Sequence, residues 1–500
     1  MDRIRIENLR SLKDTGWVDI KPITLLLGRN SSGKSSFLRL FPLLRQSLET
    51  PTTGPILWNG RLVDFGSFAE AVYKSKEKNT EITLSFEGQI GPGHETDDDP
   101  STNWNLRCEI WLSNRSANHF TYLKKVKVNY MGHELIFSFS QNPRAFKTII
   151  NNEDFSYLFT DHSELPHALD DLSRTSFRLS NLELLLDRTK LAQVFQDFSK
   201  EHLTHDMFTI IESIYSQVTL LLPDKKLLQS IKSPANRKSW KDIPNDWTLS
   251  SKPFTQFRNY LILYRLNPFL RRVDHFLNQF SGIRYLAPIR ATAQRYYRIQ
   301  DLAVNDIDFR GENLAMFLRS LSPKKREALS NWTDFHFDFK VSSKITEGHF
   351  FLELHDGDKN TNLADMGFGY SQLLPIVTQL WVLISDKGLQ DKTVYFAIEQ
   401  PELHLHPALQ AKLADCFAAA IETAKENRID LRLIIETHSQ EIVNRFGNRI
   451  AEKENQPEDI NVVIFEKNAP SEPTHVKISG YDENGYLTNW PYGFFQPDMV

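Results

Sequence analysis

The chain has 500 residues, of which 40% are hydrophobic, 12% aromatic and 24% charged. This length exceeds the ~100–200 residues of one typical domain, and the composition is that of a soluble globular protein. The net charge of −4 excludes a global basic field, and two cysteines without a CxxC neighbour indicate a reducing cytoplasmic location rather than a metal cluster.

The first predicted elements are strands. Residues 4–6 and 17–20 predict two short strands, and this beginning does not resemble a signal peptide. Residues 23–27 form a continuous apolar run, as expected for a buried strand. A helix is predicted over residues 34–48, with a kink at Pro42.

A phosphate-binding motif follows the buried strand directly. Residues 28–35 read GRNSSGKS, a full match to GxxxxGK[ST]. Glycines are needed there because backbone N–H groups must converge on phosphate oxygens without obstruction by side chains. Lys34 supplies a positive charge to the outer phosphates of ATP, and Ser35 offers its hydroxyl to Mg²⁺. The expected nucleotide-binding residues of this loop are Gly28, Arg29, Asn30, Ser31, Ser32, Gly33, Lys34, Ser35 and Ser36.

The middle of the chain changes from a strand pattern to a helix pattern. Four stretches alternate apolar and polar residues with period two, which predicts an antiparallel β layer. They are residues 81–86, 105–112, 123–130 and 134–139. From about residue 162 to 280 the spacing is helical, with amphipathic helices predicted over residues 182–186, 207–222 and 257–280. We therefore expect an N-terminal lobe with the phosphate loop (1–160), a helical insertion (161–282) and a C-terminal lobe (283–500).

The C-terminal part predicts alternating strands and helices. Strands are expected at residues 284–288, 350–354, 393–398 and 431–435. One helix is expected from Ser371, as its cap, to Ser385, and another opens at Pro407. The most apolar window, residues 373–384, is too short and too polar to cross a bilayer, so no membrane contact is expected. The order strand–helix–strand indicates an α/β fold with a parallel sheet under helices.

A carboxylate and a histidine follow the last two of these strands. Glu399 ends one strand, where its carboxylate can hold Mg²⁺ directly or through water. His438 follows the next strand, from which its ring can reach the γ-phosphate and sense hydrolysis. Because these residues and the phosphate loop stand at opposite ends of the chain, we expect a large insertion to interrupt the ATP site.

The C-terminal motifs resemble a known group of ATPases. Residues 399–407, EQPELHLHP, and residues 436–439, ETHS, resemble the ABC-type ATPases of the overcoming-lysogenization-defect (OLD), RecF and SMC kind. The resemblance is closest to predicted AAA-family ATPases of prokaryotic defence operons, in particular the ATPase subunit of Septu-like systems. It covers residues 1–70 and 283–500, and it implies an ABC-type ATPase head in which an antiparallel β layer accompanies the parallel sheet.

The same resemblance has an implication for assembly. Residues 365–372, DMGFGYSQ, stand where the family carries the signature loop that completes a partner's ATP site. Ser371 and Gln372 would then contact the γ-phosphate held by a second copy, although Gly-Tyr-Ser-Gln here replaces the family's Ser-Gly-Gly-Gln. The resemblance therefore implies a homodimer, or a higher homo-oligomer, joined through composite ATP sites.

The residue after Glu399 departs from the family pattern. Many relatives carry a second glutamate there to polarise the attacking water, whereas Gln400 has an amide that orients water but cannot accept a proton. Either hydrolysis is slow, or Glu402 or His438 compensates. The expected catalytic residues are Glu399, Gln400, Glu402 and His438, and the expected metal ligands are Ser35 and Glu399.

Three functions remain open at the level of sequence. The first is an ATPase that slowly hydrolyses ATP as a dimeric clamp or sensor in antiphage defence, triggered by DNA or a phage-encoded molecule. Residues 439–500 are too few for the Toprim domain of OLD nucleases, so an HNH or Toprim effector nuclease is expected on a separate chain. The second is a DNA-repair or recombination clamp of the RecF type. The third is an ATP-binding assembly scaffold with little turnover, which Gln400 favours.

Overall fold

The structure is a computed structural model that divides into two compact units. Unit 1 comprises Met1–Leu9, Ser47–Asn59 and Phe65–Asn278, and unit 2 comprises Arg10–Gln46, Gly60–Asp64 and Gln279–Val500. The structure describes all residues except 75–80, 91–104, 115–119, 140–145, 160–178, 205–206, 208–209, 212–220, 234–239, 242–246, 301–303, 305, 358, 468, 470–471 and 491–500. The two units cut across the three expected lobes, because the phosphate loop belongs with the C-terminal part and the antiparallel strands belong with the insertion.

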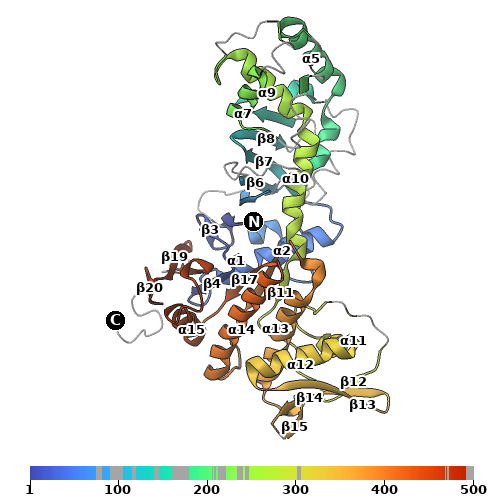
Figure 1. Cartoon of the computed structure of the whole chain (residues 1–500), viewed down its shortest axis with the longest axis vertical. Helices are drawn as coiled ribbons and strands as arrows, with labels where there is room; N and C mark the ends of the chain where they lie inside the picture. Colours follow the sequence, from blue (N-terminus) through green and yellow to red (C-terminus); the bar gives the residue numbers. More distant parts are fainter. Residues whose placement is uncertain are drawn as a thin grey trace. The chain divides into compact units, whose positions relative to one another are not determined.

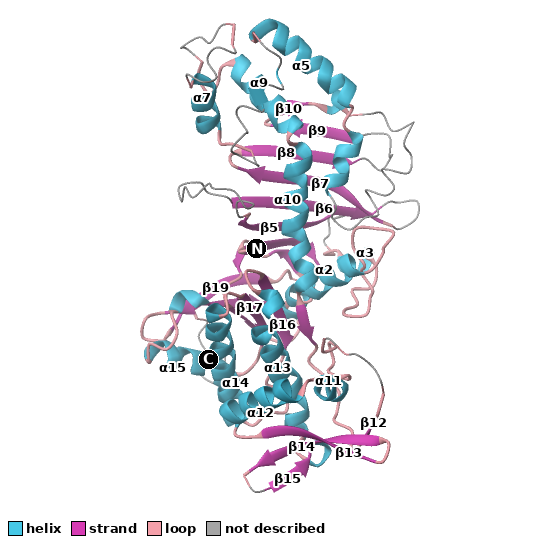
Figure 2. Ribbon diagram, turned by 45° about the vertical axis from the view of Figure 1, so that its right-hand side comes forward, coloured by secondary structure: helices cyan, strands magenta, loops and turns pink. Residues whose placement is uncertain are grey.

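Unit 1 is built on an antiparallel sheet with the strand order β10-β9-β8-β7-β6-β5-β1 (Figure 2). Its strands are β1 (Arg3–Leu9), β5 (Glu81–Gln89), β6 (Asn105–Asn114), β7 (Thr121–Tyr130), β8 (His133–Phe139), β9 (Phe146–Ile150) and β10 (Glu153–Asp154). The four strands predicted from period-two alternation are confirmed, and β6 buries every second residue over most of its length. Strands β9 and β10 were not predicted, since two to five residues are too few for a period-two pattern to stand out.

The described part of the insertion in unit 1 is largely helical, as predicted. Its helices are α5 (Arg188–His202), α7 (Asp224–Lys232), α9 (Lys252–Tyr264) and α10 (Leu266–Asn278), with the short helix η2 (Leu179–Leu185). Outside the insertion, unit 1 also contains the short helices α3 (Phe68–Ala71) and η1 (Ser156–Leu158). The single helix expected over residues 257–280 is two helices that break at Arg265. The ring of Phe269 on α10 packs on Tyr130 of β7, with 5.4 Å between ring centroids. The helix predicted over residues 207–222 lies mostly outside the described residues.

Unit 2 contains a seven-stranded sheet in the order β11-β16-β17-β4-β18-β19-β20 (Figure 1). Its strands are β11 (Arg284–Leu286), β16 (Thr393–Glu399), β17 (Asp430–Glu436), β4 (Ile23–Gly28), β18 (Ile460–Glu466), β19 (His475–Tyr481) and β20 (Leu487–Thr488). The first five strands are parallel, and the last two pairings are antiparallel. All six residues of β4 are buried, as its continuous apolar run predicted. The fold is therefore α/β, with mixed sheets and helices.

Helices and a second sheet complete unit 2. The helices are α1 (Lys34–Leu38), α2 (Leu40–Glu49, which continues past the unit boundary), α11 (Leu314–Ser320), α12 (Pro323–Phe337), α13 (Phe368–Ser385), α14 (Pro407–Glu426) and α15 (Gln440–Ala451). Short helices are η3 (Gln279–Gly282), η4 (Leu363–Asp365), η5 (Lys387–Leu389) and η6 (Pro457–Asp459). The remaining strands are β2 (Leu12–Asp14), β3 (Val18–Asp19), β12 (Tyr297–Arg298), β13 (Lys340–Thr346), β14 (His349–Asp356) and β15 (Lys359–Asn362). One hydrophobic core joins the parallel strands to α13, α14 and α15.

Two local predictions were wrong. The helix after the phosphate loop breaks at Arg39 rather than at Pro42, because Pro42 lies in the first turn of α2, where its missing N–H is not needed. Ser371 does not cap α13, because that helix begins at Phe368 after Gly367. By contrast, Pro407 opens α14 as predicted, with His406 as the N-cap.

Helix α13 is the one described helix that is long and apolar enough to cross a bilayer. In the structure 72% of this 18-residue helix is buried, and its apolar residues belong to the core of unit 2. Burial of this kind is the pattern of a core helix.

We predict that Leu433→Ala destabilises unit 2 by about 2–5 kcal/mol, since Leu433 is fully buried in β17 and its truncation leaves a cavity. The midpoint of urea unfolding, followed by circular dichroism, measures the change. Ile345→Ala is the matched control, because Ile345 is 69% exposed on β13 and should leave the midpoint nearly unchanged. An equal loss of stability in both variants would contradict the assigned core.

Candidate active site

Residues from the N-terminal and C-terminal parts of the chain meet at a cavity in unit 2. The cavity has a volume of about 360 Å³. It is lined by Arg10, Ser11, Asn30, Ser31, Ser32, Gly33, Lys34, Ser35, Ser36, Gln400, Glu436 and His438. The phosphate loop, which follows β4, and the ends of β16 and β17 thus surround one space, as expected from the motifs.

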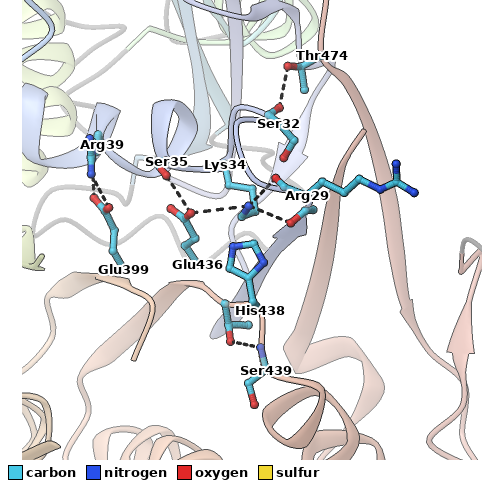
Figure 3. Close-up of polar contacts among 12 residues, drawn as sticks. Arg29, Ser32, Lys34, Ser35, Arg39, Glu399, Glu436, His438, Ser439 and Thr474 are labelled. Carbon is cyan, nitrogen blue, oxygen red and sulfur yellow. Dashed lines mark hydrogen bonds and ion pairs between the residues drawn. The ribbon is translucent and has the colours of Figure 1, made fainter. Parts of the chain in front are cut away.

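The phosphate loop is shaped by glycines that no larger residue could replace without strain. Gly33 has a φ of 105°, and a Cβ atom there would lie 2.8 Å from the hydroxyl of Ser11. A Cβ atom on Gly28 would lie 2.4 Å from the carbonyl oxygen of Phe465 on β18. The Thr474 hydroxyl donates to the carbonyl of Ser32 over 2.7 Å, and this hydrogen bond fixes the outer side of the loop (Figure 3). The loop is therefore held in one conformation from both sides.

Lys34 is buried at the base of this loop. Its ammonium donates to the carbonyl oxygens of Gly28 and Arg29, each over 2.9 Å, and it lies 3.9 Å from Oε1 of Glu436 (Figure 3). Burial lowers the pKa of Lys34. In addition to its expected contact with the phosphates, the Lys34 side chain therefore stabilises the loop and balances the negative charge of the buried Glu436 carboxylate.

Glu436, the last residue of β17, makes the contact to the loop hydroxyl. The Ser35 hydroxyl donates to Oε1 of Glu436 over 2.8 Å, while Oε2 is buried and has no hydrogen-bond partner among the described residues. Burial, and secondly the negative charge of Glu399, raise the pKa of the Glu436 carboxyl to about 7. Sequence analysis assigned no role to Glu436, although it directly precedes the Thr437-His438-Ser439 motif.

Glu399, the expected metal ligand, points to a different partner. Arg39 donates to both of its oxygens, through Nε to Oε1 over 2.7 Å and through Nη2 to Oε2 over 2.8 Å (Figure 3). The Tyr285 hydroxyl donates to Oε1 as well, over 2.7 Å. The Glu399 hydrogen bond raises the pKa of Arg39, which is therefore always charged. Glu399 does not line the cavity that holds the phosphate loop.

The cavity wall opposite the phosphate loop is formed by Gln400 and His438, and Glu402 supports this wall. Gln400 lines the cavity with a φ of 43°, and its N–H donates to the Glu436 carbonyl over 2.8 Å. The Glu402 carboxylate accepts from the Thr437 hydroxyl and from the His438 N–H, over 2.8 and 2.7 Å, so it fixes the turn after β17. The His438 ring lies beside Lys34, and burial, then Lys34, lower its pKa (Figure 3). Gln400 and His438 face the cavity, whereas Glu402 holds the loop.

The two residues expected to contact a second copy's nucleotide are engaged within their own chain. Ser371 and Gln372 are 5% and 1% exposed. The Gln372 side-chain amide accepts from the Arg290 N–H and donates to the Arg290 carbonyl, each over 3.0 Å. Nη2 of Arg290 then donates to the carbonyl oxygen of Glu399 over 2.9 Å. Gln372 is thus linked to the end of β16 rather than displayed to solvent.

The residues present fit a nucleotide with a divalent cation. The loop glycines leave room for phosphate oxygens, Lys34 supplies the positive charge, and the Ser35 hydroxyl has oxygen lone pairs beside a buried carboxylate. Among the described residues no group of three or more His, Cys, Asp or Glu is arranged as a metal site of its own. A cation here would therefore depend on the phosphates for most of its ligands, as Mg²⁺ in nucleotide sites does.

We predict that Gln372→Ala lowers stability by about 1–3 kcal/mol, since it leaves the buried backbone N–H and C=O of Arg290 without partners. The measurement is the unfolding midpoint, and the matched control is Gln294→Ala, whose side chain is exposed. Unchanged stability in both variants would show that the Gln372 amide does not hold Arg290 in solution.

Comparison with known proteins identifies the family. A family model described as "AAA ATPase domain" matches residues 1–443. No curated protein matches the chain. Solved structures that resemble it include an SMC head bound to the C-terminal winged-helix domain of ScpA (9% identity, 96% of this chain and 98% of that one covered, TM-score 0.36).

Two further structures are SMC heads. One, from Pyrococcus furiosus, has an extended coiled coil and is bound to the C-terminal domain of ScpA (9% identity, 95% of each chain covered, TM-score 0.34). The other is from Thermotoga maritima (6% identity, 95% and 98% covered, TM-score 0.35). These scores are too low to support an argument, so the family match and the phosphate-loop geometry carry the conclusion. The chain belongs to the AAA ATPase domain family and is an ATPase.

Proposed function

We propose that this ATPase is a slow, ATP-gated clamp or sensor of prokaryotic antiphage defence, which acts in the cytoplasm as a homodimer or higher homo-oligomer and controls a separate effector nuclease. The observation that carries the proposal is the position of Gln400. Its side chain lines the phosphate-loop cavity, where relatives carry a base, and an amide cannot accept the proton of an attacking water. Slow hydrolysis would keep ATP bound for long periods, which suits a sensor.

The proposed chemistry assigns a role to each wall of the cavity. Backbone N–H groups of residues 28–36 bind the phosphates, and Lys34 stabilises charge on the outer ones. Mg²⁺ would supply further stabilisation of the charge that develops on the transferred phosphoryl group. Gln400 orients water, and the neutral ring of His438 contacts the γ-phosphate side of the cavity. Glu402 acts by positioning Thr437 and His438.

The defence role and the partners are supported by the motif resemblance. The EQPELHLHP and ETHS segments are those of predicted ATPases in defence operons, in which an HNH or Toprim nuclease is a separate protein. A DNA-repair clamp of the RecF type uses the same nucleotide chemistry, and it would be recognised by ATP hydrolysis that DNA ends accelerate. A neighbouring nuclease gene and relief of nuclease inhibition by phage components would distinguish the defence role.

We predict that Lys34→Ala weakens ATP binding at least ~100-fold, because the buried Lys34 is the expected charge partner of the outer phosphates and removing one partner of a buried charge contact typically costs about 2–5 kcal/mol. Equilibrium binding of a fluorescent ATP analogue measures the loss. Lys13→Ala, which removes an exposed lysine of the same unit, should bind normally. The thermal unfolding of the Lys34→Ala variant must also be measured, because this variant leaves the Glu436 carboxylate without the positive charge of Lys34. Normal affinity in a folded Lys34→Ala protein would exclude the assigned phosphate site.

We predict that wild-type ATP turnover is slow and that Gln400→Glu accelerates it by up to ~10²-fold, since a positioned base contributes ~10²–10⁴ in rate. Phosphate release at saturating ATP measures the rate. Gln400→Ala, which removes the amide without adding a base, should not accelerate hydrolysis. Glu402→Gln and His438→Ala should lower the remaining rate. If wild-type turnover is fast and Gln400→Glu leaves it unchanged, the proposal of a slow, ATP-gated sensor is wrong.

We predict an ATP-dependent contact between the phosphate loop of one copy and the start of α13 of another. Ser31 and Phe368 are exposed, so single cysteines at these positions can report it, and the native Cys108 and Cys416 are buried. Mixing the two single-cysteine variants with ATP and an oxidant should yield a species of twice the monomer mass. A monomeric mass in light scattering with ATP, and no disulfide between chains, would rule out the composite site.

A further inference from the structure

Two carboxylates end neighbouring strands beside the phosphate loop, but they are used differently. Glu399 of β16 and Glu436 of β17 are paired in register. Both oxygens of Glu399 are engaged, because Arg39 binds them as a fork and Tyr285 adds a third hydrogen bond. A bidentate arginine neutralises the carboxylate it holds. Glu399 would have to give up this partly buried ion pair to ligate a cation.

Glu436 differs from Glu399 in that one of its two carboxylate oxygens is not engaged by any described residue. Its Oε1 accepts from the Ser35 hydroxyl, and its Oε2 is buried with no hydrogen-bond partner in the part of the chain that the structure describes. A buried carboxylate oxygen without a partner is costly unless a ligand completes it. The strand order explains the difference, since β17 lies directly beside β4 whereas β16 is one strand further away. Of the two carboxylates, Glu436 is the one that lines the cavity.

The geometry between Ser35 and Glu436 matches a magnesium site. In an octahedral Mg²⁺ complex with oxygens at about 2.0–2.1 Å, two neighbouring oxygens lie about 2.9 Å apart. The Ser35 Oγ and Glu436 Oε1 atoms are 2.8 Å apart. The hydroxyl can therefore direct its proton to the carboxylate and its lone pairs to the cation.

We propose that Glu436, rather than Glu399, is the carboxylate that holds the divalent cation of the bound nucleotide, together with the hydroxyl of Ser35. Glu399 is then the counter-ion of Arg39 and fixes the end of β16, which carries Gln400. The inference rests on the proposed ATP site. It revises the metal ligand expected from the sequence, and it assigns the cation to β17, the strand next to the phosphate loop.

The test compares nucleotide affinity with and without metal. A fluorescent ATP analogue is titrated in EDTA and in Mg²⁺, and the ratio of the two affinities gives the contribution of the cation. Mn²⁺ electron paramagnetic resonance of the same complexes reports bound metal directly. Glu436→Gln should reduce the ratio by at least ~10- to 100-fold, since mutation of residues that merely support a metal ligand already costs that much, while the affinity in EDTA is retained. Glu399→Gln should keep the wild-type ratio.

The controls separate this inference from the proposed function. Glu441→Gln changes an exposed carboxylate in the first turn of α15 and should have no effect. If Glu436→Gln does not fold, Glu436→Asp, which keeps the charge and withdraws the oxygens, must reduce the ratio. A reduced ratio in Glu399→Gln, alone or equally with Glu436→Gln, overturns the assignment. If the wild type binds no nucleotide in either buffer, the proposed ATP site itself fails.

Discussion

The strand that leads into the phosphate loop, β4, forms hydrogen bonds on both of its edges with strands from the C-terminal part of the chain. Its neighbours are β17 and β18, both parallel to it. Parallel strands cannot be joined by a tight turn, so a long connection between them is required in any case, and here it includes all of unit 1 except Met1–Leu9. The active site exists only because this pairing brings residues 28–36 beside residues 399–438.

Parallel pairing also explains why the chemistry lies at one edge of the sheet. The carboxyl ends of parallel strands point the same way, so the loop after β4 and the residues that end β16 and β17 meet in one place. Insertion of β17 between the other two strands brings Glu436 against Ser35 and Lys34, and leaves Glu399 to Arg39 and Tyr285. Strand order, rather than residue type, thus decides which carboxylate faces the loop.

A buried polar chain connects this edge to helix α13. The Gln372 amide binds the backbone of Arg290, whose guanidinium binds the carbonyl of Glu399, next to Gln400. Burial lowers the pKa of Arg290 to about 10, and two of its guanidinium nitrogens find no hydrogen-bond partner within the described ranges. Such a buried, partly satisfied arginine is costly. The same hydrogen bonds connect Gln372 of α13 to the residue before Gln400.

The sequence by itself determined the class of site. The motif GRNSSGKS, with an apolar run before it, is sufficient to predict a phosphate loop after a buried strand, and the alternation of residues 105–112 is sufficient to predict an antiparallel strand. These features depend on neighbours in sequence, where periodicity and turn chemistry act.

The tertiary structure decided the partners. Nothing in the local sequence indicates that Arg39 binds Glu399, that Gln372 is buried against Arg290, or that Ser35 donates to Glu436. By local pattern Glu399 and Glu436 look alike, since each ends an apolar strand, and sequence analysis assigned the metal to Glu399. Their difference comes from the order of strands in the sheet and from hydrogen bonds between residues more than eighty positions apart, which periodicity and spacing do not encode.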